Sequence, residues 1–429
     1  MKRVKKSMIL SSIFMGMGQF YNKDYVKGVL FSLVEIIFLF RLPGIFNSIH
    51  GLITLGEEPQ KFMNGVIVQG DHSIYMLING AITLIVVTLF AIIYVYNIND
   101  AQKTAKVVEA GKKPLKPKAF IKKILDRNFP QLMITPAFIG IVVFTILPIL
   151  FTVLLSFTNY SSPNHLPPRS LVDWVGLKNY KNLFQLDIWN GTFIKVAIWT
   201  LQWATISTVL NYVVGMFLAI LVNYKGIKFK KFWRTILMLP YAIPAFISLL
   251  VFRLGLSGPG PINNILGQMG LEKIAFFTDP VLAKVMIIMI NLWLGAPYFM
   301  ILMSGILTNI DAALYEAADI DGANRWQKFK NITFPMVLFQ TAPILIMTFA
   351  FNFNNFNIIY LLTDGNPVNS NFKYAGSTDI LITWVFKMTN DQGQYHMASV
   401  VAIVLFIFIA LVSIYSLKRT KSFEEEDMI

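Results

Sequence analysis

Residues 316–335 read EAADIDGANRWQKFKNITFP, and this polar, amphipathic stretch separates two long apolar runs of the chain. It opens with Glu316-Ala317-Ala318, a sequence that favours a helix, and Gly322 interrupts it soon afterwards. A second helix is expected to follow the glycine and to lead into the next apolar run. The stretch therefore predicts a compact helix-turn-helix that protrudes from a membrane between two spans.

The spacing of this stretch resembles the EAA loop of ABC-importer permeases. That pattern reads EAA, three residues, Gly, nine residues, Ile, any residue, Leu, Pro, and the chain departs from it only with Phe334 in place of Leu. The resemblance implies a cytoplasmic coupling loop at 309–335 that docks on an ATPase. Its expected coupling residues are Glu316, Ala317, Ala318, Gly322, Ile332 and Pro335.

Composition places the chain in a membrane. Of its 429 residues 55% are hydrophobic and only 14% are charged, where a soluble protein would carry about 25% charged residues. Apolar runs of 20 or more residues recur, and each can cross a hydrocarbon core of about 30 Å. We therefore predict an all-α polytopic membrane protein. Cysteine is absent, which excludes disulfides and thiolate chemistry.

Hydropathy predicts about eight transmembrane helices, at 25–47, 74–96, 131–157, 193–223, 235–256, 281–304, 336–361 and 396–417. With both termini in the cytoplasm, the inner segments carry 25 lysines and arginines and the outer segments 7. This asymmetry predicts an N-in, C-in topology, and it explains the net charge of +14 without nucleic acid. The short apolar segment 8–24 is expected to be interfacial or half-inserted.

Three parts follow along the chain. Residues 1–96 are expected to form an N-terminal helical hairpin, 97–130 a basic cytoplasmic linker, and 131–429 a permease domain of six spans. Pro240 and Pro244 lie inside the fifth predicted span and should kink it. The sequence has no glycine-rich phosphate loop, no metal-ligand spacing and no Ser-His-Asp grouping, so it offers no basis for an enzyme.

Two predicted spans carry unusual polarity, in NLWLGAPYFM at 291–300 and TFAFNFNNFNIIYLLTDGNP at 348–367. At helical spacing one face of the first combines Asn291, Leu294, Gly295 and Tyr298, and one face of the second Thr348, Phe351, Asn352 and Asn355. Amides pair with sugar hydroxyls and aromatic rings stack on sugar rings. The same groups also join membrane helices by hydrogen bonds and close packing, and the residues alone leave both interpretations open.

The runs AFNFNNF, LLTDGNP and NLWLGAPY are similar to the MalF-type membrane subunit of maltose/maltodextrin ABC importers, over most of residues 131–429. The resemblance implies that the two polar faces line a mid-membrane substrate site. Thr348 stands where the family can have Ser. Some relatives carry a large extracytoplasmic domain after the third span, whereas here that segment covers only about 158–192, which suggests a Gram-positive-type system.

The resemblance also implies the partners. These are a second, homologous permease, a dimer of ABC ATPases that bind ATP and Mg, an extracellular solute-binding protein, a maltodextrin substrate and membrane lipid, with no nucleic acid. The chain itself would be a transport subunit of a bacterial cytoplasmic membrane, without a cofactor of its own. A different sugar, such as a galacto-oligosaccharide or a multiple-sugar substrate, is the alternative within this class. A membrane enzyme or a proton-coupled carrier is the rival from another class. A proton-coupled carrier should show mid-membrane ionisable residues and inverted repeats, and neither is evident.

Overall fold

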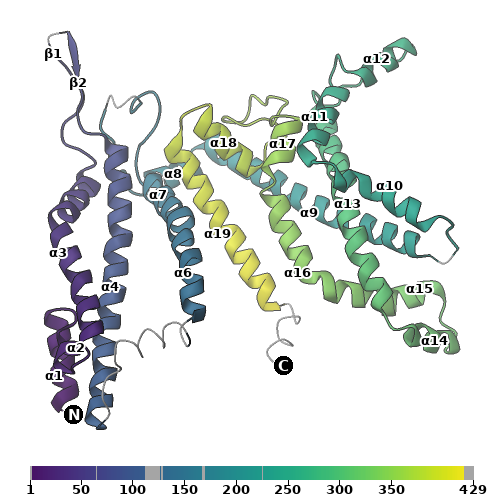
Figure 1. Cartoon of the computed structure of the whole chain (residues 1–429). Helices are drawn as coiled ribbons and strands as arrows, with labels where there is room; N and C mark the ends of the chain where they lie inside the picture. Colours follow the sequence, from purple (N-terminus) through teal and green to yellow (C-terminus); the bar gives the residue numbers. More distant parts are fainter. Residues whose placement is uncertain are drawn as a thin grey trace. The chain divides into compact units, whose positions relative to one another are not determined.

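The computed structural model describes residues 2–63, 65–111, 126, 129–166, 170–224 and 226–419, with side chains up to Ile414. Its contacts divide the chain into two compact units, Met1–Gly176 and Leu177–Ile429 (Figure 1). The predicted functional boundaries at 96 and 130 remain predictions. Most of the linker that was expected at 97–130 lies outside the described residues, although its first part continues a helix to Glu109.

The first unit is helical apart from a two-stranded antiparallel ribbon. Its elements are α1 (Lys2–Ile13), α2 (Met17–Tyr21), α3 (Tyr25–Thr54), β1 (Lys61–Met63), β2 (Val66–Val68), α4 (Ser73–Glu109), α6 (Phe129–Ile141), the π-helix η1 (Val142–Ile146) and α7 (Leu147–Ser156).

The segment before the first span folds onto α4. The buried Asn97 of α4 donates to the carbonyl of Ser11 at 3.1 Å, and Gln19 donates to the carbonyl of Asn97 at 3.0 Å. Glu35, inside α3, accepts a hydrogen bond from the amide of Met15. These bonds fix α1 and α2 on the long hairpin of α3 and α4. Their depth in the membrane stays a prediction.

The second unit begins with the short amphipathic helix α8 and ends with α19. Its elements are α8 (Lys178–Gln185), α9 (Asp187–Asn223), α10 (Lys230–Ala242), α11 (Ala245–Gly255), α12 (Pro261–Gln268), α13 (Pro280–Asn309), α14 (Ala312–Ile320), α15 (Arg325–Lys328), the π-helix η2 (Phe329–Thr333), α16 (Phe334–Phe353), α17 (Phe356–Leu362), α18 (Leu381–Asn390) and α19 (Tyr395–Arg419).

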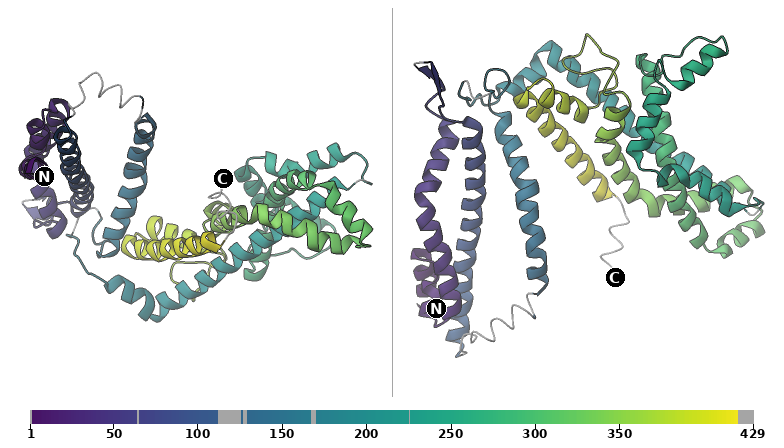
Figure 2. Two further views of the ribbon diagram at one scale, coloured as in Figure 1. Left: turned by 90° about the horizontal axis from the view of Figure 1, so that it is seen from below. Right: turned by 45° about the horizontal axis from the view of Figure 1, so that its top comes forward.

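The long helix α9 organises this unit. It packs along α13 and crosses α16, and its two buried tryptophans, Trp199 and Trp203, lie in the core with Ile287 and Ile359. α18 folds back on α19 (Figure 2). Because α9 is buried over much of its length, its polar side chains must find partners on the neighbouring helices.

The predicted number of spans is confirmed among the described residues. Seven helices or continuous helical runs are long and apolar enough to cross a membrane, and one bent pair makes an eighth. That pair is α10 and α11, which meet at an angle of 86°. Pro240 lies inside α10 and Pro244 caps α11, so the predicted kink is confirmed and is a full break.

Candidate functional site

The stretch 316–335 forms a helix-turn-helix, as its sequence predicts. Gly322 has a φ of +74° directly after α14, in the left-handed conformation that glycine adopts most easily. The amide of Ala323 donates a hydrogen bond of 2.9 Å to the carbonyl of Ala318, and this bond closes the C-terminal turn of α14. Asn324 and Gln327 then cap the second helix reciprocally, at 2.9 and 2.8 Å.

Two side-chain contacts join the arms of this hairpin. The hydroxyls of Tyr315 on α14 and Thr333 on η2 lie 2.9 Å apart, and Lys328 forms an ion pair with Asp319. η2 continues into α16 without interruption, so the run Arg325–Phe353 is one span. The hairpin is therefore tied to a membrane-crossing helix and can move with it.

The predicted coupling residues lie in this hairpin and at the start of α16. Glu316, Ala317 and Pro335 are exposed, and Ala318 and Ile332 are half-buried. An exposed carboxylate beside a small side chain offers a charge and a close approach to a partner. The hairpin thus has the features of a docking element, although the role of each residue stays a prediction.

The polar run at 352–357 ends a helix, and the prediction of one continuous helix through Asn355 is wrong. α16 ends at Phe353 and α17 begins at Phe356. Asn355 instead caps α17 through its Oδ1, which accepts from the amide of Ile358 at 3.5 Å. Asparagine side chains offer the backbone alternatives to helical hydrogen bonds, which is why this run breaks the helix.

Asn352 faces α9 rather than open space. Its Nδ2 donates to Oγ1 of Thr208 at 3.0 Å, its carbonyl accepts from the indole of Trp203 at 2.9 Å, and the residue is 2% exposed. Its neighbour Phe351 is 67% exposed. Thr348 is half-buried and its hydroxyl donates within its own helix at 2.8 Å. The predicted face of this helix is therefore divided between buried and open positions.

The predicted face of α13 is divided in the same way. Asn291 is buried, and its Nδ2 has no hydrogen-bond partner among the described residues. Gly295 packs so closely on Asn211 of α9 that a β-carbon there would lie 2.4 Å from Nδ2. Leu294 is half-buried, whereas Tyr298 is exposed. In this conformation the Asn352 amide joins two helices, the Asn291 amide is buried, and the rings of Tyr298 and Phe351 are exposed.

The residues that hold these amides come from α9, which the sequence reasoning did not single out. Trp203, Thr208 and Asn211 bond or pack against the two predicted faces. Their polar and aromatic groups recur about one turn apart within an apolar helix, and that pattern could have identified them. Tyr241, in the last turn of α10, was also not singled out, and its ring centroid lies 6.0 Å from that of Tyr298.

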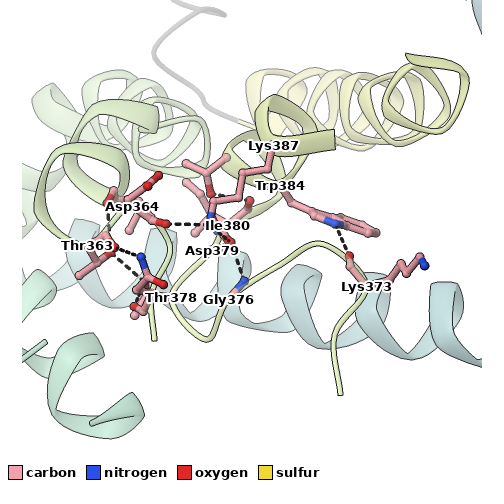
Figure 3. Close-up of polar contacts among 12 residues, drawn as sticks. Thr363, Asp364, Lys373, Gly376, Thr378, Asp379, Ile380, Trp384 and Lys387 are labelled. Atoms are coloured by element: carbon pink, nitrogen blue, oxygen red, sulfur yellow. Dashed lines mark hydrogen bonds and ion pairs between the residues drawn. The ribbon is translucent and has the colours of Figure 1, made fainter. Parts of the chain in front are cut away.

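A hydrogen-bonded loop between α17 and α18 lies beyond these motifs (Figure 3). Asp379 is completely buried, and its Oδ2 accepts from Nζ of Lys387 at 2.8 Å and from the amide of Gly376 at 2.7 Å. The same Nζ donates to the carbonyl of Asp364 at 2.6 Å. Burial raises the pKa of the Asp379 carboxyl above its ordinary value, despite the ammonium group beside it.

The other end of this loop is fixed by hydroxyl groups. Thr363 and Thr378 share a hydrogen bond of 2.8 Å, and Thr378 donates to the carbonyl of Asn366 at 2.7 Å. The indole of Trp199 on α9 donates to the carbonyl of Thr378 at 3.1 Å. The loop is therefore held at both ends, and α9 supports it. Within the described ranges, no group of three or more His, Cys, Asp or Glu side chains could hold a metal ion.

Comparison with known proteins gives close relatives over the whole chain. It is 38% identical over 422 residues to the galactooligosaccharides transport system permease protein GanP of Bacillus subtilis (strain 168), covering 97% of this chain and 98% of that protein. It is 40% identical over 439 residues to the maltodextrin transport system permease protein MalC of Streptococcus pneumoniae serotype 4 (strain ATCC BAA-334 / TIGR4), covering 100% and 98%.

The fold has a counterpart among solved structures. A bacterial ABC transporter involved in the import of the acidic polysaccharide alginate superimposes with a TM-score of 0.57, covering 71% of this chain and 98% of that one at 22% identity. The family of binding-protein-dependent transport system inner membrane components matches residues 211–420, which hold both polar motifs and the helix-turn-helix. Together with the full-length relatives, this match shows that the chain belongs to the binding-protein-dependent transport system inner membrane component family, as a permease of the MalF type.

Proposed function

We propose that this chain is the permease subunit of an ATP-driven importer that carries maltodextrins across a bacterial cytoplasmic membrane. The observation that carries the proposal is the pair of whole-length relatives named as oligosaccharide permeases, one of them for maltodextrin. The open aromatic rings of Phe351 and Tyr298 beside buried amides agree with a sugar substrate. A transport subunit needs no catalytic centre of its own.

The partners in this proposal are a second, homologous permease, a separate pair of ABC ATPases that bind ATP and Mg, and an extracellular solute-binding protein. The exposed Glu316 offers a carboxylate to a basic side chain of one ATPase. The Tyr315–Thr333 bond ties the hairpin α14–α15 to the start of α16. Movement of the ATPase would therefore displace the hairpin and α16 together as a rigid body. The spans would then alternate between inward-facing and outward-facing states.

The proposed substrate site consists of the two polar faces at the middle of the membrane. In the present conformation Asn352 bonds Thr208 on α9, and Asn291 is buried. Sugar binding would therefore require α9 and α16 to shift apart, which releases the Asn352 amide from Thr208 for a sugar hydroxyl. Such a change couples site opening to the movement of α16, the same helix that carries the hairpin.

A galacto-oligosaccharide is the second candidate substrate, because GanP matches the chain over nearly its whole length. Uptake by cells of the native host distinguishes the two candidates. Cells from which this gene has been deleted should lose uptake of labelled maltotetraose and regain it when the gene is restored. Loss of galactotetraose uptake with intact maltotetraose uptake would assign the alternative substrate. Intact uptake of both would refute the proposed function.

A further inference from the structure

A cavity of about 280 Å³ lies in the second unit, beside the outer loop between α17 and α18 and apart from the two polar motifs. Its volume is just below the range of about 300–1,000 Å³ for drug-sized ligands, which leaves room for about one sugar unit. It lies between α9, the first turns of α13, and the loop that precedes α18. The lining side chains that matter here are Lys195, Trp199, Gln202, Lys284, Ser377 and Asp379.

Two lysines supply hydrogen-bond donors at this cavity. Nζ of Lys284 lies 4.4 Å from the ring centroid of Trp199, and Nζ of Lys195 lies 5.8 Å from that of Phe372. Neither ammonium group forms an ion pair with a carboxylate in the part of the chain that the structure describes. Both therefore keep donors available for a ligand, next to aromatic rings.

Asp379 lies in the wall behind this cavity and is fully buried. Lys387 and Gly376 occupy its Oδ2, whereas its Oδ1 is buried and has no hydrogen-bond partner among the described residues. A buried carboxylate oxygen without a donor is energetically unfavourable. A β-carbon at Gly365 would lie 2.1 Å from this oxygen, so Oδ1 faces Gly365 and is not open to a ligand. The bonds that hold the loop (Figure 3) fix Asp379 in place, and with it the wall of the cavity.

The groups that line the cavity suit a hydroxyl-rich ligand. Sugar hydroxyls accept from ammonium groups, and they can both donate to and accept from the amide of Gln202 and the hydroxyl of Ser377. The rings of Trp199 and Phe372 add apolar surface for a sugar ring.

α9 connects this cavity to the proposed substrate site. The indole of Trp199 bonds to Thr378 in the outer loop, and the indole of Trp203 bonds to Asn352 in the polar motif, at 3.1 and 2.9 Å. The two tryptophans are four residues apart, which is about 6 Å along a helix. The cavity thus lies toward the predicted extracytoplasmic end of α9, roughly one turn beyond the proposed site.

We propose that this cavity is an outer subsite that binds an additional sugar unit of a longer oligosaccharide, above the unit that reaches the middle of the membrane. The inference rests on the proposed function. A disaccharide would be transported without using the subsite. A longer chain would engage Lys195, Gln202 and Lys284 as well, so these residues would contribute to chain-length preference.

The test compares transport of maltose and maltohexaose by the complete importer in proteoliposomes. The variants are Lys195→Gln and Gln202→Ala, whose side chains are exposed, and Lys284→Gln, which is half-buried. Lys181→Gln on α8 is the matched control, because Lys181 is exposed and does not line the cavity. Each variant at the cavity should raise the KM for maltohexaose about 5- to 20-fold and leave the KM for maltose within about twofold.

Equal changes in the KM for both sugars, or an unchanged KM for maltohexaose, would contradict the proposed subsite. A wild-type importer that carries neither sugar would instead refute the proposed function, so the two failures are distinguishable. Stability in detergent serves as a second readout, because a purely structural role would lower the melting temperature of the variants without separating the two sugars.

Discussion

Gly295 on α13 lies directly against the side-chain amide of Asn211 on α9, with room for a hydrogen atom but not for a methyl group. A β-carbon at residue 295 would come within 2.4 Å of Nδ2. Gly305, ten residues further along the same helix, has nothing within 4 Å of the corresponding position. The two glycines therefore have different roles, although both look alike in the sequence.

Gly295→Ala should destabilise the protein by about 1–3 kcal/mol, because α13 or Asn211 must move to make room. Gly305→Ala should be neutral or slightly stabilising, since it only improves helix propensity. Thermal unfolding of the purified complex measures both. Equal melting temperatures for the two variants would show that the close approach of α9 and α13 does not constrain residue 295.

The second prediction concerns coupling to the ATPase. Gly322→Pro should distort the turn, because proline cannot adopt a φ of +74° and lacks the amide that bonds Asp319 at 3.1 Å. Glu316→Lys should place a cation against an expected cation, a contact that costs on the order of a few kcal/mol. Both should lower transport and sugar-stimulated ATP hydrolysis at normal membrane levels.

Asn331→Lys is the matched control for this pair, since Asn331 is exposed on the same hairpin and the change adds a positive charge. It should keep near-normal activity. Wild-type transport in both the Glu316 and the Gly322 variants would mean that the hairpin is not the coupling element.

The third prediction separates a substrate role from packing in the asparagine run. If Asn352 and Asn355 contact sugar, replacing either by Leu should cost about 1–3 kcal/mol of binding, because a sugar hydroxyl is left unpaired. Asn354→Leu should alter uptake little, since that side chain is exposed and bonds only weakly within its helix, at 3.4 Å. Maltodextrin uptake is measured with membrane levels matched.

Thr208→Val completes this comparison. It removes only the partner of Asn352 on α9, so it should change stability without raising the KM for sugar. Should Asn352→Leu behave as Thr208→Val does, with lower stability and an unchanged KM, the amide serves helix packing and is not part of the substrate site.

How far the sequence predicts this structure depends on the range of the interactions involved. Apolar run length is a local property, and it located the spans; Gly322 was likewise identified by its local role in a helix turn. Whether Asn352 points toward α9 depends on a residue 144 positions away, which one helix's periodicity cannot reveal. The helix break at Asn355 was missed because the periodic argument assumed an unbroken helix.

The fourth prediction tests topology. A cysteine in place of Asn164 should react with an impermeant thiol reagent in intact cells, whereas one in place of Lys231 should react only after permeabilisation. Both side chains are exposed, and the chain has no native cysteine to interfere. The reverse labelling pattern would invert the N-in, C-in arrangement and place the helix-turn-helix outside the cell.

The fifth prediction concerns pH at the outer end of the first hairpin. Oδ2 of Asp71 accepts from the amides of Glu57 and Glu58 at 2.8 and 3.0 Å, and these bonds lower the pKa of Asp71 below its ordinary value of 3.8. The stability that these two bonds give the loop is fully present above pH 3.8, and it is lost as the pH falls through the lowered pKa of Asp71. Hydrogen exchange measures protection of the two amides.

In the wild type this protection, relative to nearby amides, should persist at neutral pH and decline only in strong acid. Asp71→Asn should weaken the protection of the two amides at every pH and remove its dependence on pH. Protection in the Asn variant equal to that in the wild type would show that the carboxylate charge does not hold the loop.

The break between α10 and α11 has a consequence for hydration. In an unbroken helix the amide of residue 244 would bond the carbonyl of Pro240, but Pro244 has no amide hydrogen. Hydrocarbon chains offer no donor either, so a carbonyl freed at membrane depth has to meet protein or water. Pro240 and Pro244 thus create a need for water or protein beside this helix pair, and they do so without adding a charged side chain to the bilayer.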